Sequence, residues 1–523
     1  MRFVYRRIPS LPRLAWCAVM RRGSSDVEID HGPWVETRDG FFVEGAWPGA
    51  FSAGAFDRSS LLMGSGARLA DDRVRFCCSC QMLERLHLVA HADKLIISPS
   101  LTFALARSNS HLDMTHIPYQ VDLLYMLYRM ANHIGAIPLA NGRHMQIVHY
   151  RNIDIDRDLS IRMQHKPDSR DFESFADYKG FLCDNLAAVF RNAADGERSI
   201  RYEPVASLSS GFDSAACAAL ANEVGCRDAM TFRTARPEQC LSGDINDSGR
   251  PIAETLGMDV REYDRTDYLR KDGMPEAEFV AWGDLGQDLQ FSAMEDNLER
   301  RILITGWHGD GMWSVHKEEL DRDIPRPEAG GCCLVEFRLR VGFILLPVAF
   351  FGCRSRASVN AISRSDEMAP WRSGGKYDRP IPRRIVAERG VRRDMQTSRK
   401  KAISVLLNRN ERIRSQMKPE SLDSFEAFYR RHCSERPRVT QIFYAAMFTL
   451  YRVFYSVLSI GNRALSRLHV PLSLPHPLPE RFSQPPGRPS FLVHWGSAVI
   501  RPRYNVPDEP MTETEANSNA PRA

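Results

Sequence analysis

The chain contains 523 residues and has a mass of 59.5 kDa, a length that usually corresponds to about two or three domains. Its 43% hydrophobic and 26% charged residues are typical of soluble globular proteins rather than of low-complexity chains. The formal net charge of +5 is small for this length, so no stable binding of nucleic acid is expected from charge.

The N-terminal residues are basic, with arginine at positions 2, 6, 7, 13, 21 and 22. No apolar run of the length found in secretory signals follows them, so we expect residues 1–33 to form a disordered leader. The 12 cysteines are scattered along the chain, which favours reduced thiols and a cytoplasmic location. Cys77, Cys78 and Cys80 lack a second pair at zinc-site spacing, so buried free cysteines are expected.

Short apolar stretches separated by turn residues characterise residues 34–165. Examples are Leu86–Ala90, Lys94–Ser98 and 145–148. Their period of two and the frequent Gly, Asp and Asn residues between them predict an antiparallel, β-rich domain.

A change of period marks a second region, residues 166–410. Apolar side chains from Phe172 to Phe190 fall on one helical face. Strands are then expected at 205–208, 229–232, 260–263 and 302–305, with helices between them. This alternation predicts an α/β architecture with a parallel sheet whose ligand sites lie at the carboxyl ends of the strands.

The strand at 205–208 runs into the turn Ser209-Ser210-Gly211-Phe212-Asp213-Ser214, which precedes an apolar-periodic segment. A strand, a tight turn and a helix direct backbone N–H groups at a phosphate. Serine hydroxyls can donate to phosphate oxygens, and Asp213 can hold a divalent cation that bridges them. A polar turn in which Asp213 and Ser214 cap the helix is the alternative.

Beyond these strands we expect residues 411–504 to be mainly helical and the polar, acidic residues 505–523 to be disordered.

Residues 442–460 are apolar and nearly long enough to cross a membrane, but Arg452 at their middle would be costly in lipid. A buried or interfacial helix is therefore favoured. Peripheral membrane contact stays open, as does a homodimer.

A second glycine-spaced turn, Thr305-Gly306-Trp307-His308-Gly309-Asp310-Gly311, follows the strand at 302–305. Together, Ser-x-Gly-x-Asp-Ser and the later Thr-Gly-x-x-Gly-Asp resemble the ATP-pyrophosphatase (PP-loop) synthetase domain of asparagine synthetase and its relatives. That resemblance implies an adenine nucleotide alpha hydrolase-like fold for residues 166–410. The family pattern is Ser-Gly-Gly-x-Asp-Ser, so Ser210 stands where the middle glycine would be.

The resemblance also implies the ligands of the site. ATP would be bound by residues at the strand ends and in the first turn: Leu208, Ser209, Ser210, Gly211, Asp213, Ser214, Phe232, Thr305 and Gly306. Asp213 and Asp310 would hold Mg²⁺, with a helix-capping role as the alternative for Asp310. A lysine near a late Arg-x-Lys motif would contact pyrophosphate. Lys401 has the spacing from Arg399 and Lys400 fits the distance from Val391, so both stay candidates for this catalytic role.

The implied reaction is adenylation of a carboxylate, from aspartate or a related acid, with release of pyrophosphate and transfer of the acyl group to ammonia or another amine. In asparagine synthetase a glutamate follows the Ser-Gly of the third-strand turn and helps to deprotonate the amine. Here Trp307 stands at that position and His308 comes next. Tryptophan cannot act as a base, so the amine stays open.

The order of features in residues 34–165 is similar to the glutaminase half of asparagine synthetase. That activity needs an N-terminal cysteine as nucleophile, whereas Met1 is followed here by Arg2 and the first cysteine is Cys17. We therefore expect a degenerate domain without glutaminase activity, unless the true start of the chain exposes a cysteine. A PP-loop enzyme that modifies RNA and a non-catalytic ATP-binding relative are the competing functions.

Overall fold

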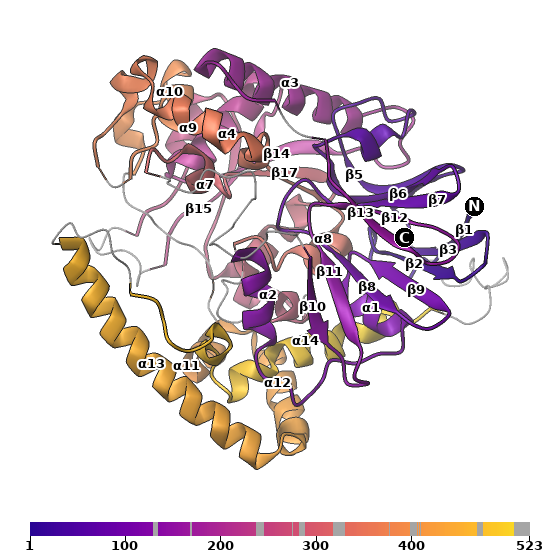
Figure 1. Ribbon diagram of the computed structural model, residues 1–523. Coiled ribbons are helices and arrows are strands. Elements are labelled where there is room, and N and C mark those ends of the chain that lie inside the picture. The colour runs from indigo at the N-terminus through magenta and orange to yellow at the C-terminus, as the bar shows by residue number, and fades with distance from the viewer. Residues whose placement is uncertain are drawn as a thin grey trace.

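The protein is a mixed α/β molecule with a β-rich N-terminal region, a parallel sheet and C-terminal helices (Figure 1). This architecture agrees with the prediction of an α/β protein with a β-rich N-terminal region, a parallel sheet and a helical C-terminal region. The computed structural model describes residues 1–128, 134–167, 170–236, 245–274, 276–281, 288–316, 330–375, 377–397, 405, 407, 409–467 and 474–506.

Two sheets face each other in the N-terminal region. A seven-stranded sheet has the order β1-β3-β2-β9-β8-β11-β10, and a six-stranded sheet has the order β13-β12-β7-β6-β5-β4. Most neighbouring strands are antiparallel, as predicted, although β1 and β3 are parallel. The strands are β1 (Arg2–Arg7), β2 (Trp16–Arg21), β3 (Asp26–His31), β4 (Glu36–Arg38), β5 (Phe41–Ala46), β6 (Met63–Ala70), β7 (Arg73–Cys77), β8 (Leu86–Ala90), β9 (Lys94–Ser98), β10 (Ile134–Pro138), β11 (His144–Val148), β12 (Asn152–Ile155) and β13 (Ile161–Gln164).

The prediction that residues 1–33 form a disordered leader is wrong, because these residues supply three strands of the seven-stranded sheet. Trp16 is fully buried between the two sheets, with its ring 4.9 Å from that of Phe42. Two of the arginines that suggested a leader pair across strands instead: Arg2 pairs with Asp26, and Nε of Arg6 lies 2.6 Å from a carboxylate oxygen of Asp30. Within β1, Arg2 and Arg6 lie on one face of the strand and Phe3 and Tyr5 on the other, which is the period of a strand with one buried face.

The parallel sheet has five strands in the order β16-β15-β14-β17-β18. They are β14 (Glu203–Leu208), β15 (Asp228–Phe232), β16 (Asp259–Tyr263), β17 (Arg301–Thr305) and β18 (Ile344–Pro347). The four strands predicted from sequence are confirmed, and β18 is a fifth. From β14 the chain adds β15 and then β16 on one side of the sheet. It then crosses to the other side of β14, where it adds β17 and β18, so the direction of strand addition reverses between β14 and β17.

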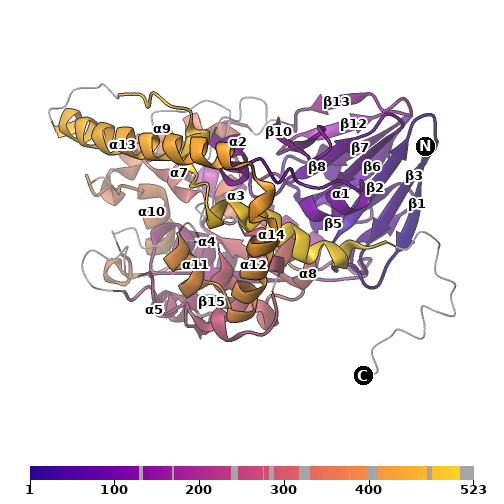
Figure 2. The same ribbon diagram turned by 90° about the horizontal axis from the view of Figure 1, so that it is seen from below.

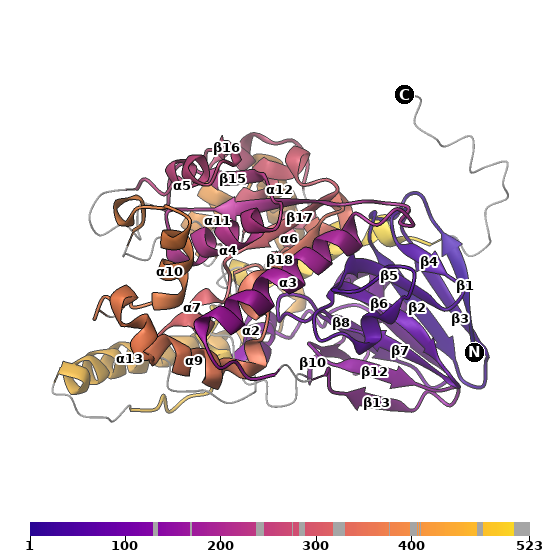
Figure 3. The same ribbon diagram turned by 90° about the horizontal axis from the view of Figure 1, so that it is seen from above.

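Helices flank the parallel sheet, and the long α3 packs against β14 of that sheet and against β5 of the N-terminal strands (Figure 3). The helices are α1 (Leu101–Arg107), α2 (Tyr119–Tyr128), α3 (Phe175–Ala193), α4 (Phe212–Glu223), α5 (Arg250–Thr255), α6 (Glu276–Val280), α7 (Gly309–Trp313), α8 (Val335–Val341), α9 (Arg356–Arg364), α10 (Pro380–Glu388), α11 (Asn410–Gln416), α12 (Pro419–His432), α13 (Arg438–Arg467) and α14 (Leu492–Ile500).

The C-terminal region is mainly helical, as predicted, and its longest helix lies at the periphery of the molecule (Figures 1 and 2). Within α13, residues Arg438–Asn462 are long and apolar enough to cross a membrane by length and composition, and only 6% of their most apolar window is buried. Of the two alternatives expected for residues 442–460, the buried helix is therefore wrong, and the interfacial helix stays a prediction. The predicted disordered tail lies, from residue 507 onward, outside the described residues.

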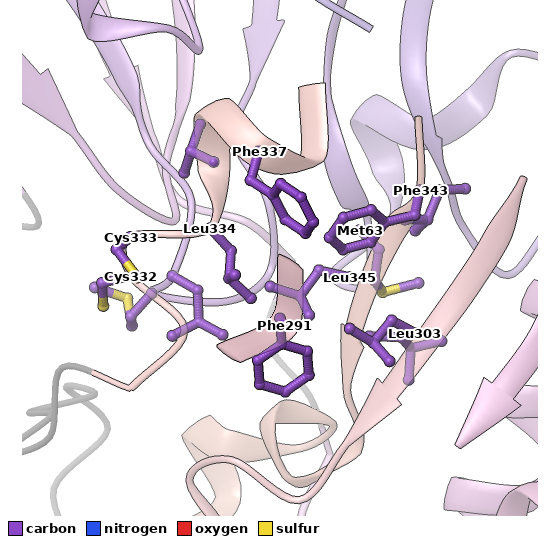
Figure 4. Packing of buried hydrophobic residues seen from close by; sticks show 14 of the residues in the cluster. Met63, Phe291, Leu303, Cys332, Cys333, Leu334, Phe337, Phe343 and Leu345 are labelled. Carbon is purple, nitrogen blue, oxygen red and sulfur yellow. The ribbon is translucent and has the colours of Figure 1, made fainter. Parts of the chain in front are cut away.

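One hydrophobic core joins the N-terminal strands to the parallel sheet. Met63 of β6 lies beside Phe343, which precedes β18 (Figure 4). Leu345 of β18, Leu303 of β17 and Phe337 of α8 complete this part of the core. All of these side chains are almost completely buried. Burial of apolar surface at this junction stabilises the two regions as a single packed unit.

A buried ion cluster crosses the same junction. The guanidinium of Arg338, on α8, donates to both carboxylate oxygens of Glu44 on β5, at 2.7 and 3.0 Å. Its Nε lies 2.5 Å from a carboxylate oxygen of Glu84, and all three side chains are at most 6% exposed. Burial raises the pKa of Glu44 although Arg338 acts to lower it, so the charged state of Glu44 depends on the arginine.

We predict that Arg338→Met destabilises the protein by about 3–5 kcal/mol, because it leaves buried carboxylates without their cation. Chemical denaturation measures this change. The loss of stability in Arg338→Met should become smaller as the pH falls, because protonation neutralises Glu44. Arg2→Met, which removes a fully exposed ion pair with Asp26, should leave the unfolding midpoint unchanged. Equal effects of the two variants would contradict the described cluster.

Candidate functional site

The two turns singled out in the sequence lie at the carboxyl ends of adjacent parallel strands. β14 pairs with β15 on one side and with β17 on the other. The strand order reverses between β14 and β17, and in open α/β sheets such a switch point opens a crevice for ligands. The turn after β14 and the turn after β17 therefore meet at the position that this rule assigns to a ligand.

The two turns touch through glycines. A methyl group added to Gly306 would lie 2.5 Å from the backbone nitrogen of Ser214, and one added to Gly309 would lie 2.4 Å from Cγ of Asp213. Both distances are far shorter than any van der Waals contact. The first turn of α4 can approach the end of β17 this closely only because residues 306 and 309 carry no side chain.

A cavity of about 200 Å³ lies between these turns. Every ligand residue predicted within the described part of the chain lines it, except Ser210. The lining residues are Ser207, Leu208, Ser209, Gly211, Asp213, Ser214, Phe232, Asp247, Phe291, Thr305, Gly306, Trp307, His308, Asp310, Tyr377, Arg379 and Thr397. Asp213 and Asp310, which are distant in sequence, thus share one cavity.

Ser210 does not line the cavity, contrary to the prediction that it faces a bound nucleotide. Its hydroxyl donates to a carboxylate oxygen of Asp247 at 2.7 Å, and its backbone N–H donates to the Asp247 carbonyl at 3.1 Å. Ser210 is 9% exposed. The serine that replaces the family's middle glycine therefore anchors the turn to the segment after β15.

The other serines of the turn form a hydrogen-bonded pair. The hydroxyl oxygens of Ser209 and Ser214 lie 2.8 Å apart, and the Ser214 hydroxyl also accepts from the backbone N–H of Ser209 at 3.1 Å. The N-cap of α4 is Gly211, which has no side chain to cap the helix. Because the first N–H groups of a helix have no partner within it, this end of α4 is suited to an anion.

A buried cation lies beside Asp213. The guanidinium of Arg379 forms an ion pair with Asp213. Burial lowers the pKa of Arg379, but the nearby charges of Asp213 and Asp310 outweigh this effect, so the pKa is raised overall. The Arg379 guanidinium also lies over the ring of Tyr377, with its central carbon 4.1 Å from the ring centroid. The arginine therefore neutralises part of the acidic charge of the cavity.

Within the part of the chain that the structure describes, no three His, Cys, Asp or Glu side chains gather to hold a metal ion by themselves. Asp213 and Asp310 can still supply two carboxylates. Mg²⁺ is usually held by one or two carboxylates together with substrate phosphates and water. The donor set fits a metal ion that arrives with a phosphate ligand.

Aromatic side chains line the rest of the cavity. Phe232 packs edge-on against Phe291, with ring centroids 5.9 Å apart, and Phe291 in turn contacts Trp307 at 5.7 Å. His308 is buried, has a left-handed backbone with φ of 71°, and stacks on Phe350 at 4.5 Å. These rings provide an apolar surface against which a planar group can pack.

Sequence reasoning missed some residues of the cavity. Arg379 and Tyr377 belong to the segment before α10, and the sequence shows only that a basic tract begins there. Asp247 follows β15 in a polar segment next to Gly249, a pattern that suggests a turn but no ligand. Lys400 and Lys401 lie outside the described residues. Thr397, shortly before them, lines the cavity and donates its backbone N–H to the carbonyl of Ser210.

Three cysteines of the N-terminal region, Cys17, Cys77 and Cys78, are buried. Cys17 is fully buried in β2, between β3 and β9, and burial raises the pKa of its thiol. Burial likewise raises the pKa of Cys77 and Cys78 to about 12. Such environments disfavour the thiolate, which is the reactive form, and the prediction of buried free cysteines is confirmed for these residues.

No protein-family model matches the chain, and no curated protein matches it.

We predict that Gly306→Ala and Gly309→Ala each destabilise the protein by about 1–3 kcal/mol, because the added methyl group overpacks the contact between the turns. Gly180→Ala is the matched control. Gly180 lies within α3 and a methyl group there meets nothing within 4 Å, so this change should be neutral or stabilise slightly. Thermal unfolding measures all three. Unchanged stability of Gly306→Ala would contradict the close approach.

Proposed function

We propose that the protein is an ATP-dependent carbon–nitrogen ligase related to asparagine synthetase, which adenylates a carboxylate, releases pyrophosphate and forms an amide. The observation that carries this proposal is the convergence of Asp213 and Asp310 on one cavity at the switch point of a parallel sheet. Two carboxylates from separate strand ends, beside a helix N-terminus, suit a magnesium-bound polyphosphate.

The first turn supports binding of the phosphates. Its donors are the N–H groups at the start of α4 and the hydroxyls of Ser209 and Ser214, which line the cavity. Leu208, Phe232 and Gly306 lie at the ends of three neighbouring strands around the same space. In the proposed complex they flank the adenosine, as the resemblance to PP-loop synthetases implies.

Arg379 has a further role in this proposal. Charge builds up on the phosphate oxygens during adenylation, and a preorganised cation stabilises it. In the structure the guanidinium is paired with Asp213. A bound Mg²⁺ would supply the charge that balances both carboxylates, so Arg379 becomes available to a phosphate or a substrate carboxylate.

The acceptor amine is not assigned. Trp307 lines the cavity at the position where asparagine synthetase carries its glutamate. His308, the next residue, is buried against Phe350. The buried Cys17 supports a proposed ligase that uses ammonia or another amine from solution, without a glutaminase in the N-terminal region.

Asp213→Asn and Asp310→Asn test the proposal. Each variant should weaken Mg²⁺-dependent binding of ATP by at least about tenfold, because a carboxylate ligand of a cation is lost. Isothermal titration calorimetry with and without Mg²⁺ measures this. Asp259→Asn, an exposed residue at the opposite end of the same sheet, is the matched control and should bind ATP normally. Normal binding by Asp213→Asn would refute the site.

Pyrophosphate release separates the proposed ligase from its competitors. We expect release from ATP in the presence of one member of a carboxylate panel that includes aspartate and glutamate. Release that requires RNA instead would identify an RNA-modifying enzyme. Binding of ATP without release under any condition would identify a non-catalytic relative.

Arg379→Ala is predicted to lower kcat for pyrophosphate release by about 10²-fold or more, because a preorganised cation is lost from the charged transition state. Arg379→Lys keeps the charge but loses the planar guanidinium, so it should recover part of the rate. Single-turnover measurements at saturating ATP give the rate of pyrophosphate release for each of the two variants. A loss confined to KM for ATP would indicate that Arg379 binds the ground state only.

A further inference from the structure

The outward face of α13 carries a continuous apolar stripe. At about 100° per residue, Val439, Ile442, Ala446, Leu450, Val453, Val457 and Ile460 all fall within about 80° of the helix circumference. The exposed fractions of the large members run from 42% at Leu450 to 79% at Val439. Soluble monomers rarely expose a contiguous apolar patch of this kind unless it binds something.

The opposite face of α13 is occupied by the protein itself. Tyr444 contacts Phe482 with ring centroids 5.4 Å apart. Tyr451 stacks on His476 at 3.9 Å, and His476 also hydrogen bonds to the carbonyl of Tyr451 at 3.1 Å. These contacts fix the rotation of the helix about its axis. The apolar stripe is therefore held facing away from the body, at the periphery seen in Figures 1 and 2.

Charge identifies the kind of partner that the stripe fits. Residues Arg438–Arg467 include arginines and contain no aspartate or glutamate. Arg438 and Arg452 are exposed and lie on the same flank of the apolar stripe by helical position. Long cationic side chains beside an apolar stripe can reach lipid head groups while the stripe enters the boundary of the acyl chains.

Two other occupants are less compatible with this charge pattern. A second copy of the helix would bring arginines together with no carboxylate from either helix to pair with them. A helix that crosses the bilayer would have to leave the body, which breaks the contacts of Tyr444 and Tyr451, and would place Arg452 in the hydrocarbon region.

We propose that α13 docks the folded protein on the surface of an anionic lipid bilayer, with the stripe from Val439 to Ile460 in the interface and Arg438 and Arg452 on the head groups. The orientation follows from the packing of the inward face, so the membrane is bound without unfolding of the C-terminal region. This binding is independent of the cavity between β14 and β17.

Vesicle flotation of the full chain tests this inference. The wild-type protein should float with vesicles of phosphatidylcholine and phosphatidylglycerol, and much less with phosphatidylcholine alone. The triple variant Ile442→Ser, Val453→Ser and Val457→Ser should bind at least about tenfold more weakly, because apolar surface buried in the interface is lost. Arg452→Gln should weaken binding to the anionic vesicles about fivefold. Added salt should weaken the wild type similarly.

Val4→Ser is the matched control, since Val4 is 42% exposed on β1, outside the helix, and it should float like the wild type. Asp213→Asn should also float normally, which separates this inference from the proposed function. Equal flotation of the triple variant and the wild type, or none by either, would overturn the inference. So would a lipid-free dimer that the triple variant abolishes, or vesicle-bound protein that resists alkaline carbonate, which indicates a spanning helix.

Discussion

The close approach of two backbone turns is the constraint on which the candidate site depends. Gly306 and Gly309 lie so near the start of α4 that a single methyl group on either one would overlap Ser214 or Asp213. This contact sets the position of Asp310 relative to Asp213. The proposed magnesium site follows from it, because the site needs both carboxylates on one cavity.

The N-terminal region packs against the parallel sheet that carries the cavity. Met63 packs into the same core as the strands of the parallel sheet, and the buried cluster of Arg338, Glu44 and Glu84 crosses the junction. Removal of either side would expose apolar surface and leave charges buried without partners. The β-rich region therefore has a structural role in supporting the parallel sheet, whether or not it has a chemistry of its own.

The pattern of apolar residues along the sequence predicted many of the strands and the parallel sheet. Alternation of apolar residues located β8 and β9 with the observed bounds, and the alternation of strands and helices gave the parallel sheet. Strand periodicity fails where charge obscures it: the arginines of β1 suggested a leader, although they pair with Asp26 and Asp30 across the sheet. An ion pair between strands depends on a partner that the local sequence does not identify.

Some features of the site could likewise be predicted from the sequence, and others depend on tertiary contacts. The two glycine turns are local patterns, so Asp213 and Asp310 could be selected from the sequence. Long-range packing decided that Ser210 turns toward Asp247, that Arg379 pairs with Asp213, and that the apolar stripe of α13 faces outward. The chain alone specified which groups follow which strands, because a strand, a turn and a helix are determined by neighbouring residues. Only the tertiary structure decided which of those groups meet, because each such contact joins segments that are far apart in sequence.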